Sequence, residues 1–436
     1  MTPDTPVPTA RSPPTFDSRL LSLPNELQDM VLAEVDDSQS LLNVSLTNRH
    51  LQAMAEPHLY RDVFIVDHRG YKSFMRAIKA KPPRVKSVRY LNVNLGSKKE
   101  YKRSLKRFMS SKPGRIVDWG FISLLSNLEN LYVKSYDLNE PFTDLLKHAA
   151  KGKALRSLKT CEIFPVDNEE VSRRIHWQAR TIWYQDILQH PTLKELTLLN
   201  FIGSPVHRLA GQSPTPLQRL EIISSALSLK AIKNVLSHAQ SLKELIIYPD
   251  PVPVSMETLF SMPRFTADVF ESVQDSLQKL VIYNGIPGTS IDPMPLHGMV
   301  ALRHLAIADD GLFGVLPEDG MTGITLNNLK MIFPPNVEIW EMDCDENEVM
   351  ATTNPILTHK DDLCPKLRRI SIPDALKDEV SDEDLRRFAA AGIDLTFDFR
   401  SLHFSHDGEQ GVYDTELQRP MVICSDGLSL PISYID

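Results

Sequence analysis

The chain has 436 residues, of which 42% are hydrophobic and 24% are charged, and its formal net charge at pH 7 is −8. This length can hold two or three average domains or one elongated repeat array, and the apolar content is enough for a substantial core. No run of the sequence approaches the roughly 18 to 20 apolar residues that a membrane-spanning helix needs. The acidic balance argues against nucleic acid as the partner. We expect protein partners, and because no such apolar run is present we expect no membrane.

The N-terminal residues are rich in proline. Residues 1–17 include five prolines, and they lack the basic start and apolar core of a secretory signal. We therefore predict a disordered tail over residues 1–17. We also expect the protein in the cytoplasm, the nucleus or both.

The sequence contains no motif that carries chemistry. There is no Gly-rich phosphate loop, no His-Glu-x-x-His and no Gly-x-Ser-x-Gly elbow, and the thirteen histidines are dispersed. Cys161, Cys344, Cys364 and Cys424 form no Cys-x-x-Cys pair, so we expect buried reduced thiols rather than disulfides or a zinc site. We predict a non-enzyme without catalytic residues, cofactor or metal. An enzyme whose catalytic groups converge only in the fold is the alternative.

Three short helices are predicted near the N-terminus. Pro24 suits the first turn of a helix, and Ser22 can cap it. A second helix follows over residues 41–46, and a third begins near Thr47. The apolar residues at helical spacing in the first helix are Leu23, Leu27, Met30, Val31 and Val35. Because so small a bundle cannot bury all of its apolar groups, we expect some of them to remain for a partner.

This segment resembles an F-box over residues 18–64. The matching residues are Leu23, Pro24, Glu26, Leu27, Met30, Leu41, Leu42, Val44, Leu46, Arg49, Leu59, Tyr60 and Arg61. The chain departs from the usual pattern at Met30, Val35 and His50. The resemblance implies binding to a Skp-family adaptor, and through it to a cullin, by the residues above other than Arg49 and Arg61. The alternative is a generic three-helix subdomain with a capped helix start.

A six-residue phrase with apolar first, fourth and sixth places recurs through the rest of the chain. Clear copies begin at Leu128, Leu193, Leu217, Leu242, Leu277, Leu302 and Leu367, weaker ones at Leu155 and Val337, and a possible first one at Val85. Successive starts from Leu193 to Leu302 are 24 to 35 residues apart, which fits one strand and one return segment. The fourth and sixth places alternate as one face of a strand. The stretches between look helical, namely residues 142–150, 171–188, 227–239 and 382–391.

This repeating part resembles the irregular leucine-rich repeats that often follow an F-box. We predict an α/β fold in which the N-terminal three-helix F-box precedes a curved leucine-rich-repeat solenoid over residues 65–400, and residues 401–436 form a C-terminal extension. The resemblance implies parallel strands on the concave face and helices on the convex face. An ordinary α/β sheet with leucine-rich strands is the alternative.

The concave face is the predicted target-binding surface. The seventh places form an apolar ladder of Leu199, Ile223, Tyr248, Tyr283 and Ala308. The third and fifth places add polar groups, namely Glu195, Thr197, Arg219, Glu221, Glu244, Lys279, His304, Glu341, Arg369 and Ser371. We expect Leu199, Ile223, Tyr248, Tyr283, Arg219, Lys279 and His304 to contact the target. Two alternatives stay open: each strand bends and tucks its seventh place into the core, or residues 401–436 cover the ladder.

Positive charge is concentrated in one segment. Residues 79–115 contain thirteen Lys or Arg and one acid, Glu100, in a chain that is acidic overall. Such a run can attract acidic protein segments, phosphate groups or an import receptor, or it can be a solvated face.

Together these two resemblances imply the substrate-recognition subunit of an SCF-type cullin-RING ubiquitin ligase, in which the F-box binds the Skp adaptor and the repeats bind a target protein. The ligation chemistry then belongs to other subunits. The alternative is a repeat scaffold that binds a partner without any coupling to ubiquitination.

Overall fold

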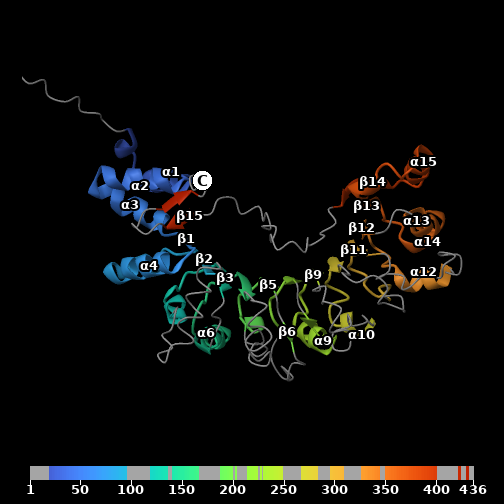
Figure 1. Cartoon of the computed structure of the whole chain (residues 1–436), viewed down its shortest axis with the longest axis horizontal. Coiled ribbons are helices and arrows are strands. Elements are labelled where there is room, and N and C mark those ends of the chain that lie inside the picture. The colour runs from blue at the N-terminus through green and yellow to red at the C-terminus, as the bar shows by residue number, and fades with distance from the viewer. Residues whose placement is uncertain are drawn as a thin grey trace, which may run out of the picture.

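The computed structural model describes residues 19–95, 118–135, 140–165, 187–199, 202–203, 214–223, 226–227, 229–248, 267–282, 295–308, 326–343, 349–399, 421–423 and 429–431. The predicted tail over residues 1–17 therefore lies outside the described residues. Figure 1 shows one open sheet that follows an arc, with helices along its outer side and the N-terminal helices at one end.

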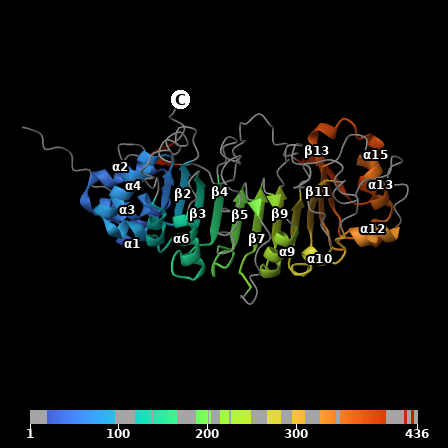
Figure 2. The ribbon, with the colours of Figure 1, turned by 60° about the horizontal axis from the view of Figure 1, so that its bottom comes forward.

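Twelve parallel strands form this sheet in the order β1-β2-β3-β4-β5-β7-β9-β10-β11-β12-β13-β14, seen side by side in Figure 2. They are β1 Asp62–Ile65, β2 Tyr90–Leu95, β3 Asn130–Ser135, β4 Thr160–Pro165, β5 Glu195–Leu199, β7 Arg219–Ile223, β9 Glu244–Tyr248, β10 Lys279–Ile282, β11 His304–Ala308, β12 Ile339–Asp343, β13 Arg369–Pro373 and β14 Asp394–Phe399. The order follows the sequence without a reversal, so the sheet is not doubly wound. The predicted α/β class and the predicted parallel strands are confirmed.

Helices and turns connect successive strands. The helices are α4 His68–Ala80, α6 Glu140–Ala150, α9 Leu229–His238, α10 Ala267–Phe270, α12 Leu326–Ile332, α13 Val349–Thr358, α14 Lys360–Leu363 and α15 Asp382–Ala390, and the 3-10 turns are η2 Pro82–Lys86, η3 Trp119–Leu124 and η7 Asp374–Leu376. The short pair β6 Ile202–Gly203 and β8 Ala226–Leu227 lies beside the main sheet. Three of the four predicted helical stretches are confirmed as α6, α9 and α15. Most of the fourth, 171–188, lies outside the described residues.

The phrase register is confirmed in most repeats. Each strand begins at the third place, and the fourth and sixth places face the core. Buried pairs at these two places are Leu131 and Val133, Leu196 and Leu198, Leu220 and Ile222, Leu245 and Ile247, Leu280 and Ile282, Leu305 and Ile307, Trp340 and Met342, and Ile370 and Ile372. The first place is buried as well, as Leu128 and Leu277 show.

Two predicted copies are wrong by three residues. Val85 lies in η2, and the phrase of β2 begins instead at Val88, which is fully buried. Leu155 adopts a positive φ of 52° in the turn before β4, so the phrase there begins at Leu158. The structure also adds a copy that the sequence did not suggest, which begins at Tyr60 and contains β1.

A continuous backbone hydrogen-bond ladder joins the second places of the repeats. The carbonyl of Arg61 accepts from the N–H groups of Arg89 and Tyr90 at 2.8 and 3.0 Å, and the carbonyl of Lys159 accepts from Lys194 and Glu195 at 2.7 and 3.0 Å. The second-place residues, in order, are Arg61, Arg89, Glu129, Lys159, Lys194, Gln218, Lys243, Gln278, Arg303, Glu338 and Arg368. Since the junctions repeat this arrangement, the strands all start along the same edge of the sheet.

The main core lies between the sheet and the outer helices and turns. Trp119 of η3 packs edge-on against Phe142 of α6 with ring centroids 5.1 Å apart, and Phe333 packs edge-on against Trp340 of β12 at 5.3 Å. All four rings are at most 1% exposed, and such burial supplies most of the stabilising free energy. No helix among the described residues combines the length and apolar character needed to span a bilayer.

The N-terminal helices are η1 Arg19–Ser22, α1 Asn25–Ala33, α2 Ser38–Thr47 and α3 Arg49–Leu59. They pack around a separate small core of Leu32, Leu41 and Ala55. Asp37 caps α2 by accepting from the N–H groups of Gln39 and Ser40. The predicted cap at Ser22 is wrong, because Ser22 ends η1 and Pro24 takes the N-cap position of α1 without a side-chain bond.

The three helices run directly into the sheet. Only two residues separate α3 from β1, so the predicted boundary at residues 64 and 65 falls inside that strand. The antiparallel pair β15 Met421–Ile423 and β16 Ser429–Pro431 lies against β1, α2 and α4. Figure 1 shows this pair at the N-terminal end of the arc. The described parts of the predicted C-terminal extension therefore return to the start of the fold.

Candidate partner-binding surface on the N-terminal helices

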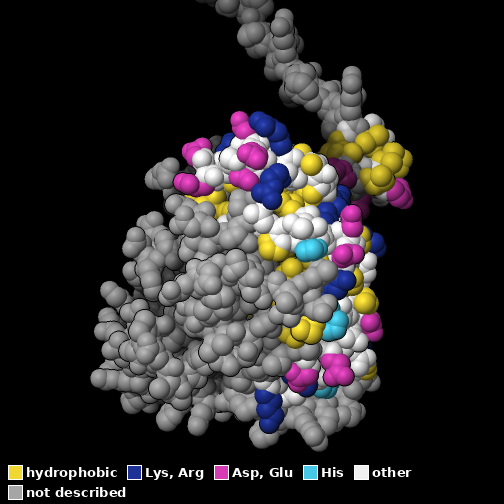
Figure 3. Space-filling model, turned by 90° about the vertical axis from the view of Figure 1, so that its right-hand side faces the viewer, with side chains coloured by type: hydrophobic (Ala, Val, Ile, Leu, Met, Phe, Trp, Pro, Cys, Tyr) yellow, Lys and Arg dark blue, Asp and Glu magenta, His cyan; other side chains and the backbone are white. Residues whose placement is uncertain are grey.

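Exposed apolar side chains gather on η1, α1 and α2. Ten large apolar side chains are exposed among the described residues, and six of them lie within residues 21–46: Leu21, Leu23, Leu27, Met30, Val31 and Leu46. In Figure 3 a group of hydrophobic side chains stands out at the upper right, where the described chain begins. Met30 and Leu46 are 63% and 73% exposed, which is unusual for side chains of this size unless a partner covers them.

Helix α1 carries three of its large apolar residues on the outside and one polar residue on the inside. Its buried residues are Gln28 and Leu32, one turn apart, whereas Leu27, Met30 and Val31 are exposed. A surface helix of a globular protein normally turns its apolar stripe toward the core. The outer face of α1 is therefore an exposed apolar surface.

Gln28 is satisfied where it is buried. Its amide nitrogen donates to the carbonyl of Leu23 at 2.6 Å, and its Oε1 lies 3.0 Å from Nε2 of His50 in α3. Asp29 makes a second link between the same helices, with Oδ1 2.8 Å from Nε2 of His58. These two bonds fix the rotation of α1 on α3, so the exposed apolar face is held in one orientation.

The residues implied by the resemblance divide by burial. Leu23, Pro24, Glu26, Leu27, Met30 and Leu46 are exposed, and Leu42, Val44, Leu59 and Tyr60 are partly buried. Leu41 is only 5% exposed and belongs to the small core, so we withdraw it as a contact residue. Val31 is exposed beside Met30 and joins the surface; its helical spacing in the sequence could have placed it there. We define the helical apolar surface as Leu23, Leu27, Met30, Val31 and Leu46.

Known proteins give no further guidance. No protein-family model matches the chain, and no curated protein matches it.

The predicted apolar ladder on the concave face is wrong at Ile223. This side chain is only 2% exposed and packs with Ile246, Val281 and Ala306, which occupy the fifth places of the next three strands. The side chains of Leu199, Tyr248 and Ala308, and the whole of Tyr283, lie outside the described residues. The concave face thus has a buried apolar centre in β7, β9, β10 and β11 in place of an exposed ladder at Ile223.

The predicted polar residues of the concave face pair largely with one another. Arg219 lies 3.4 Å from Glu221 and 3.3 Å from Glu244, and Nε2 of His304 lies 2.9 Å from Glu341. Thr197 donates a hydrogen bond to Glu221, and Arg369 lies 3.9 Å from Asp394. Of the remaining predicted residues, Ser371 is buried, Lys279 is half-buried and Glu195 is exposed. Most of these charges are therefore already compensated within the sheet.

Glu162 was not among the predicted site residues. It occupies the fifth place of β4, between Tyr132 of β3 and Thr197 of β5. Burial, reinforced by the nearby carboxylate of Glu221, raises the pKa of Glu162 to about 7. The ring of Tyr132 packs against Phe164 at 4.7 Å, and burial raises the pKa of Tyr132 as well. Glu162 was missed because the predicted phrase begins at Leu155. A phrase that begins at Leu158 puts Glu162 at its fifth place.

The remaining candidates add no chemistry to the described residues. Cys161 and Cys364 are buried thiols whose pKa values are raised by burial, as predicted, while Cys344 and Cys424 lie outside the described residues. No group of three or more His, Cys, Asp or Glu side chains within the described ranges is arranged to hold a metal ion. Residues 96–117, the larger part of the basic segment, also lie outside them.

Proposed function

We propose that this protein is the substrate-recognition subunit of an SCF-type cullin-RING ubiquitin ligase. The N-terminal helices act as an F-box that docks on a Skp-family adaptor, and the leucine-rich-repeat solenoid binds the target protein. The chain itself is non-catalytic, and its role is to hold the target near the ubiquitin-conjugating machinery of the other subunits. Such a protein works in the cytoplasm, the nucleus or both.

The observation that carries the proposal is the reversed pattern of α1. A partner that covers Leu27, Met30 and Val31 gains about 1.5 to 3 kcal/mol for each side chain that becomes fully buried. The same face contains the exposed residues of the Leu-Pro-x-Glu-Leu pattern, namely Leu23, Pro24, Glu26 and Leu27. The surface that the F-box resemblance assigns to the adaptor is therefore apolar, exposed and unpartnered among the described residues.

A second observation supports a presenting role. Tyr60 belongs to the Leu-Tyr-Arg end of the F-box pattern and is also the first place of the first repeat, where it packs against the main core. Arg84 lies over its ring, with the guanidinium carbon 4.7 Å from the centroid. Because the helices and the sheet share this residue, a bound target is held at a fixed position relative to the adaptor.

Co-purification with a Skp-family adaptor and a cullin tests the proposal. The intact chain should retain both, and the double variant L27E/M30E should retain neither, because two buried carboxylates would stand in an apolar contact. A matched control is V300E/M331E, which places the same charges on exposed apolar residues of the repeats and should bind normally.

Two outcomes would contradict the proposal. Failure of the folded intact chain to bind any Skp adaptor would reduce the helical segment to a structural cap. Binding of the adaptor without cullin, and without effect on target turnover, would favour the alternative of a repeat scaffold outside ubiquitination.

A further inference from the structure

A row of positive charge runs along the edge where the strands begin. Of the eleven second-place residues joined by the backbone ladder, seven are Lys or Arg, two are Gln and two are Glu. All seven basic side chains are exposed. We call these eleven residues the basic row. The row has a net charge of +5, although the net charge of the whole chain is −8.

Ion pairs show that the side chains of the row lie next to one another. Glu129 lies 3.2 Å from Arg89 and 2.5 Å from Lys159, which come from the repeats on either side of it. Glu338 repeats this arrangement at the other end of the sheet, 3.4 Å from Arg303 and 3.2 Å from Arg368. The row is therefore a physical line of charges and not only a pattern of the sequence.

The middle of the row has no such compensation. Lys194 and Lys243 form no ion pair with any residue that the structure describes. In the row, Lys194 lies between Lys159 and Gln218, and Lys243 lies between Gln218 and Gln278. Lys159 and Lys194 precede neighbouring strands, and like charges on neighbouring strands repel each other. An anionic partner would remove this repulsion.

We propose that the basic row binds an extended acidic segment of a partner protein. Neighbouring strands are about 4.8 Å apart, so basic groups one or two strands apart are spaced by about 5 to 10 Å. An extended peptide presents side chains on one side about every 6.8 Å, which flexible Lys and Arg side chains can follow. Gln218 and Gln278 add amide donors for the carboxylates between the charges.

The composition of the row favours an acidic protein over nucleic acid. Single-stranded nucleic acid is bound by basic grooves that also carry aromatic rings for base stacking, and none of the eleven places holds an aromatic residue. The edge is also distinct from the concave face and from the helical apolar surface. The inference therefore stands whether or not the chain belongs to a ubiquitin ligase.

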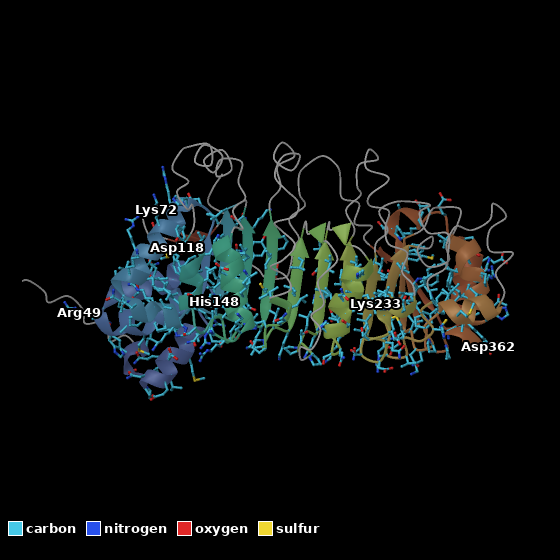
Figure 4. All side chains as sticks on the ribbon, turned by 90° about the horizontal axis from the view of Figure 1, so that it is seen from below. Arg49, Lys72, Asp118, His148, Lys233 and Asp362 are labelled. Atoms are coloured by element: carbon cyan, nitrogen blue, oxygen red, sulfur yellow. The ribbon has the colours of Figure 1, made fainter. Side chains whose placement is uncertain are left out.

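Fluorescence anisotropy with the full chain and a labelled twelve-residue polyglutamate peptide tests this inference. The test variant is K194E/K243E, which reverses two uncompensated charges of the row. The control is K72E/K230E, which makes the same charge change at exposed lysines of α4 and α9. Figure 4 shows Lys72 toward the opposite edge, where the strands end.

The intact chain should bind the peptide with an affinity that falls steeply as salt is added. The row variant should bind at least about tenfold more weakly, and the control should stay within about twofold of the intact chain. Circular dichroism should show the same unfolding midpoint for both variants. Equal weakening in both variants, or no binding at low salt, would overturn the inference. Tighter row-dependent binding of a single-stranded oligonucleotide of equal charge would also overturn it, in favour of nucleic acid.

Discussion

Glu56 of α3 accepts a hydrogen bond from Nε of Arg84 at 2.8 Å and also pairs with Lys81. These two cations lie beyond α4, so the contact ties the N-terminal helices to the first repeat. Although burial opposes the charged form, the hydrogen bonds from Lys81 and Arg84 lower the pKa of Glu56. The ion pairs of Glu56 with Lys81 and Arg84 and the contact of Tyr60 with the main core both join the N-terminal helices to the first repeat.

Replacing Glu56 with Gln should destabilise the protein at neutral pH. The carboxylate makes charge-assisted bonds with two cations, and loss of such bonds costs about 1.5 to 3 kcal/mol. Because folding lowers the pKa of Glu56, its contribution is complete above the unfolded value of 4.5 and is lost as the pH falls through the folded value. Urea denaturation should thus show a gap between wild type and E56Q at pH 7 that closes on acidification. A gap that does not narrow at all as the pH is lowered below 4.5 would refute this account.

The sequence predicted the repeat phrase, its buried places and most of the helices. It placed two copies wrongly because overlapping patterns satisfy the same spacing: Val85 and Val88 can both begin a phrase, as can Leu155 and Leu158. Turn geometry decides between the two candidates in each case. Val85 lies in the 3-10 turn η2, and Leu155 adopts a positive φ in a turn, so each precedes the phrase instead of beginning it. The apolar residues of α1 were predicted as partner contacts, but the inward position of Gln28 depends on His50 in another helix.

The concave face was predicted less well, for a physical reason. The spacing shows that Ile223 does not share the core-facing side of Leu220 and Ile222. Its exposure, however, depends on which residues from other strands lie next to it. The fifth places Ile246, Val281 and Ala306 make that neighbourhood apolar, and a single repeat does not contain this information.

Replacing Gln28 with Ala should destabilise the N-terminal helices. Gln28 is 2% exposed, and its loss leaves the carbonyl of Leu23 and the ring of His50 without their bonds. We expect a loss of about 1 to 3 kcal/mol. Hydrogen exchange should localise the change to α1 and α3 and leave the amides of β9 and β10 protected. A uniform loss of protection would mean that the helices and the sheet unfold as one unit.

Two leucines of α2 should respond oppositely to alanine. Leu41 is 5% exposed in the small core, so L41A should cost about 2 to 5 kcal/mol. Leu46 is 73% exposed, so L46A should change stability by no more than about 0.5 kcal/mol and should instead weaken adaptor binding. Thermal unfolding and adaptor titration on both variants measure the two effects. Normal adaptor affinity of L46A would remove Leu46 from the helical apolar surface.

Replacing Glu162 with Gln should stabilise the protein at alkaline pH. Burial, together with the neighbouring Glu221, raises the pKa of Glu162 to about 7, so the folded state binds a proton that the unfolded state releases near 4.5. Stability of the wild type should therefore fall as the pH rises from about 4.5 to about 7 and should then level off. Glutamine resembles the protonated acid, so E162Q should gain about 1 to 3 kcal/mol over wild type at pH 8 and little at pH 4.

The matched control for this titration is E195Q, which makes the same charge change at an exposed third place on the adjacent strand. It should stay within about 0.5 kcal/mol of wild type at both pH values. If E195Q gains as much as E162Q at pH 8, the effect comes from the general negative charge of the concave face. If only E162Q gains, the cause is local burial in β4, and a cationic group of a bound target placed there would draw the proton from Glu162. In that case target binding at pH 6 should release protons, which calorimetry in buffers of different ionisation enthalpy can count.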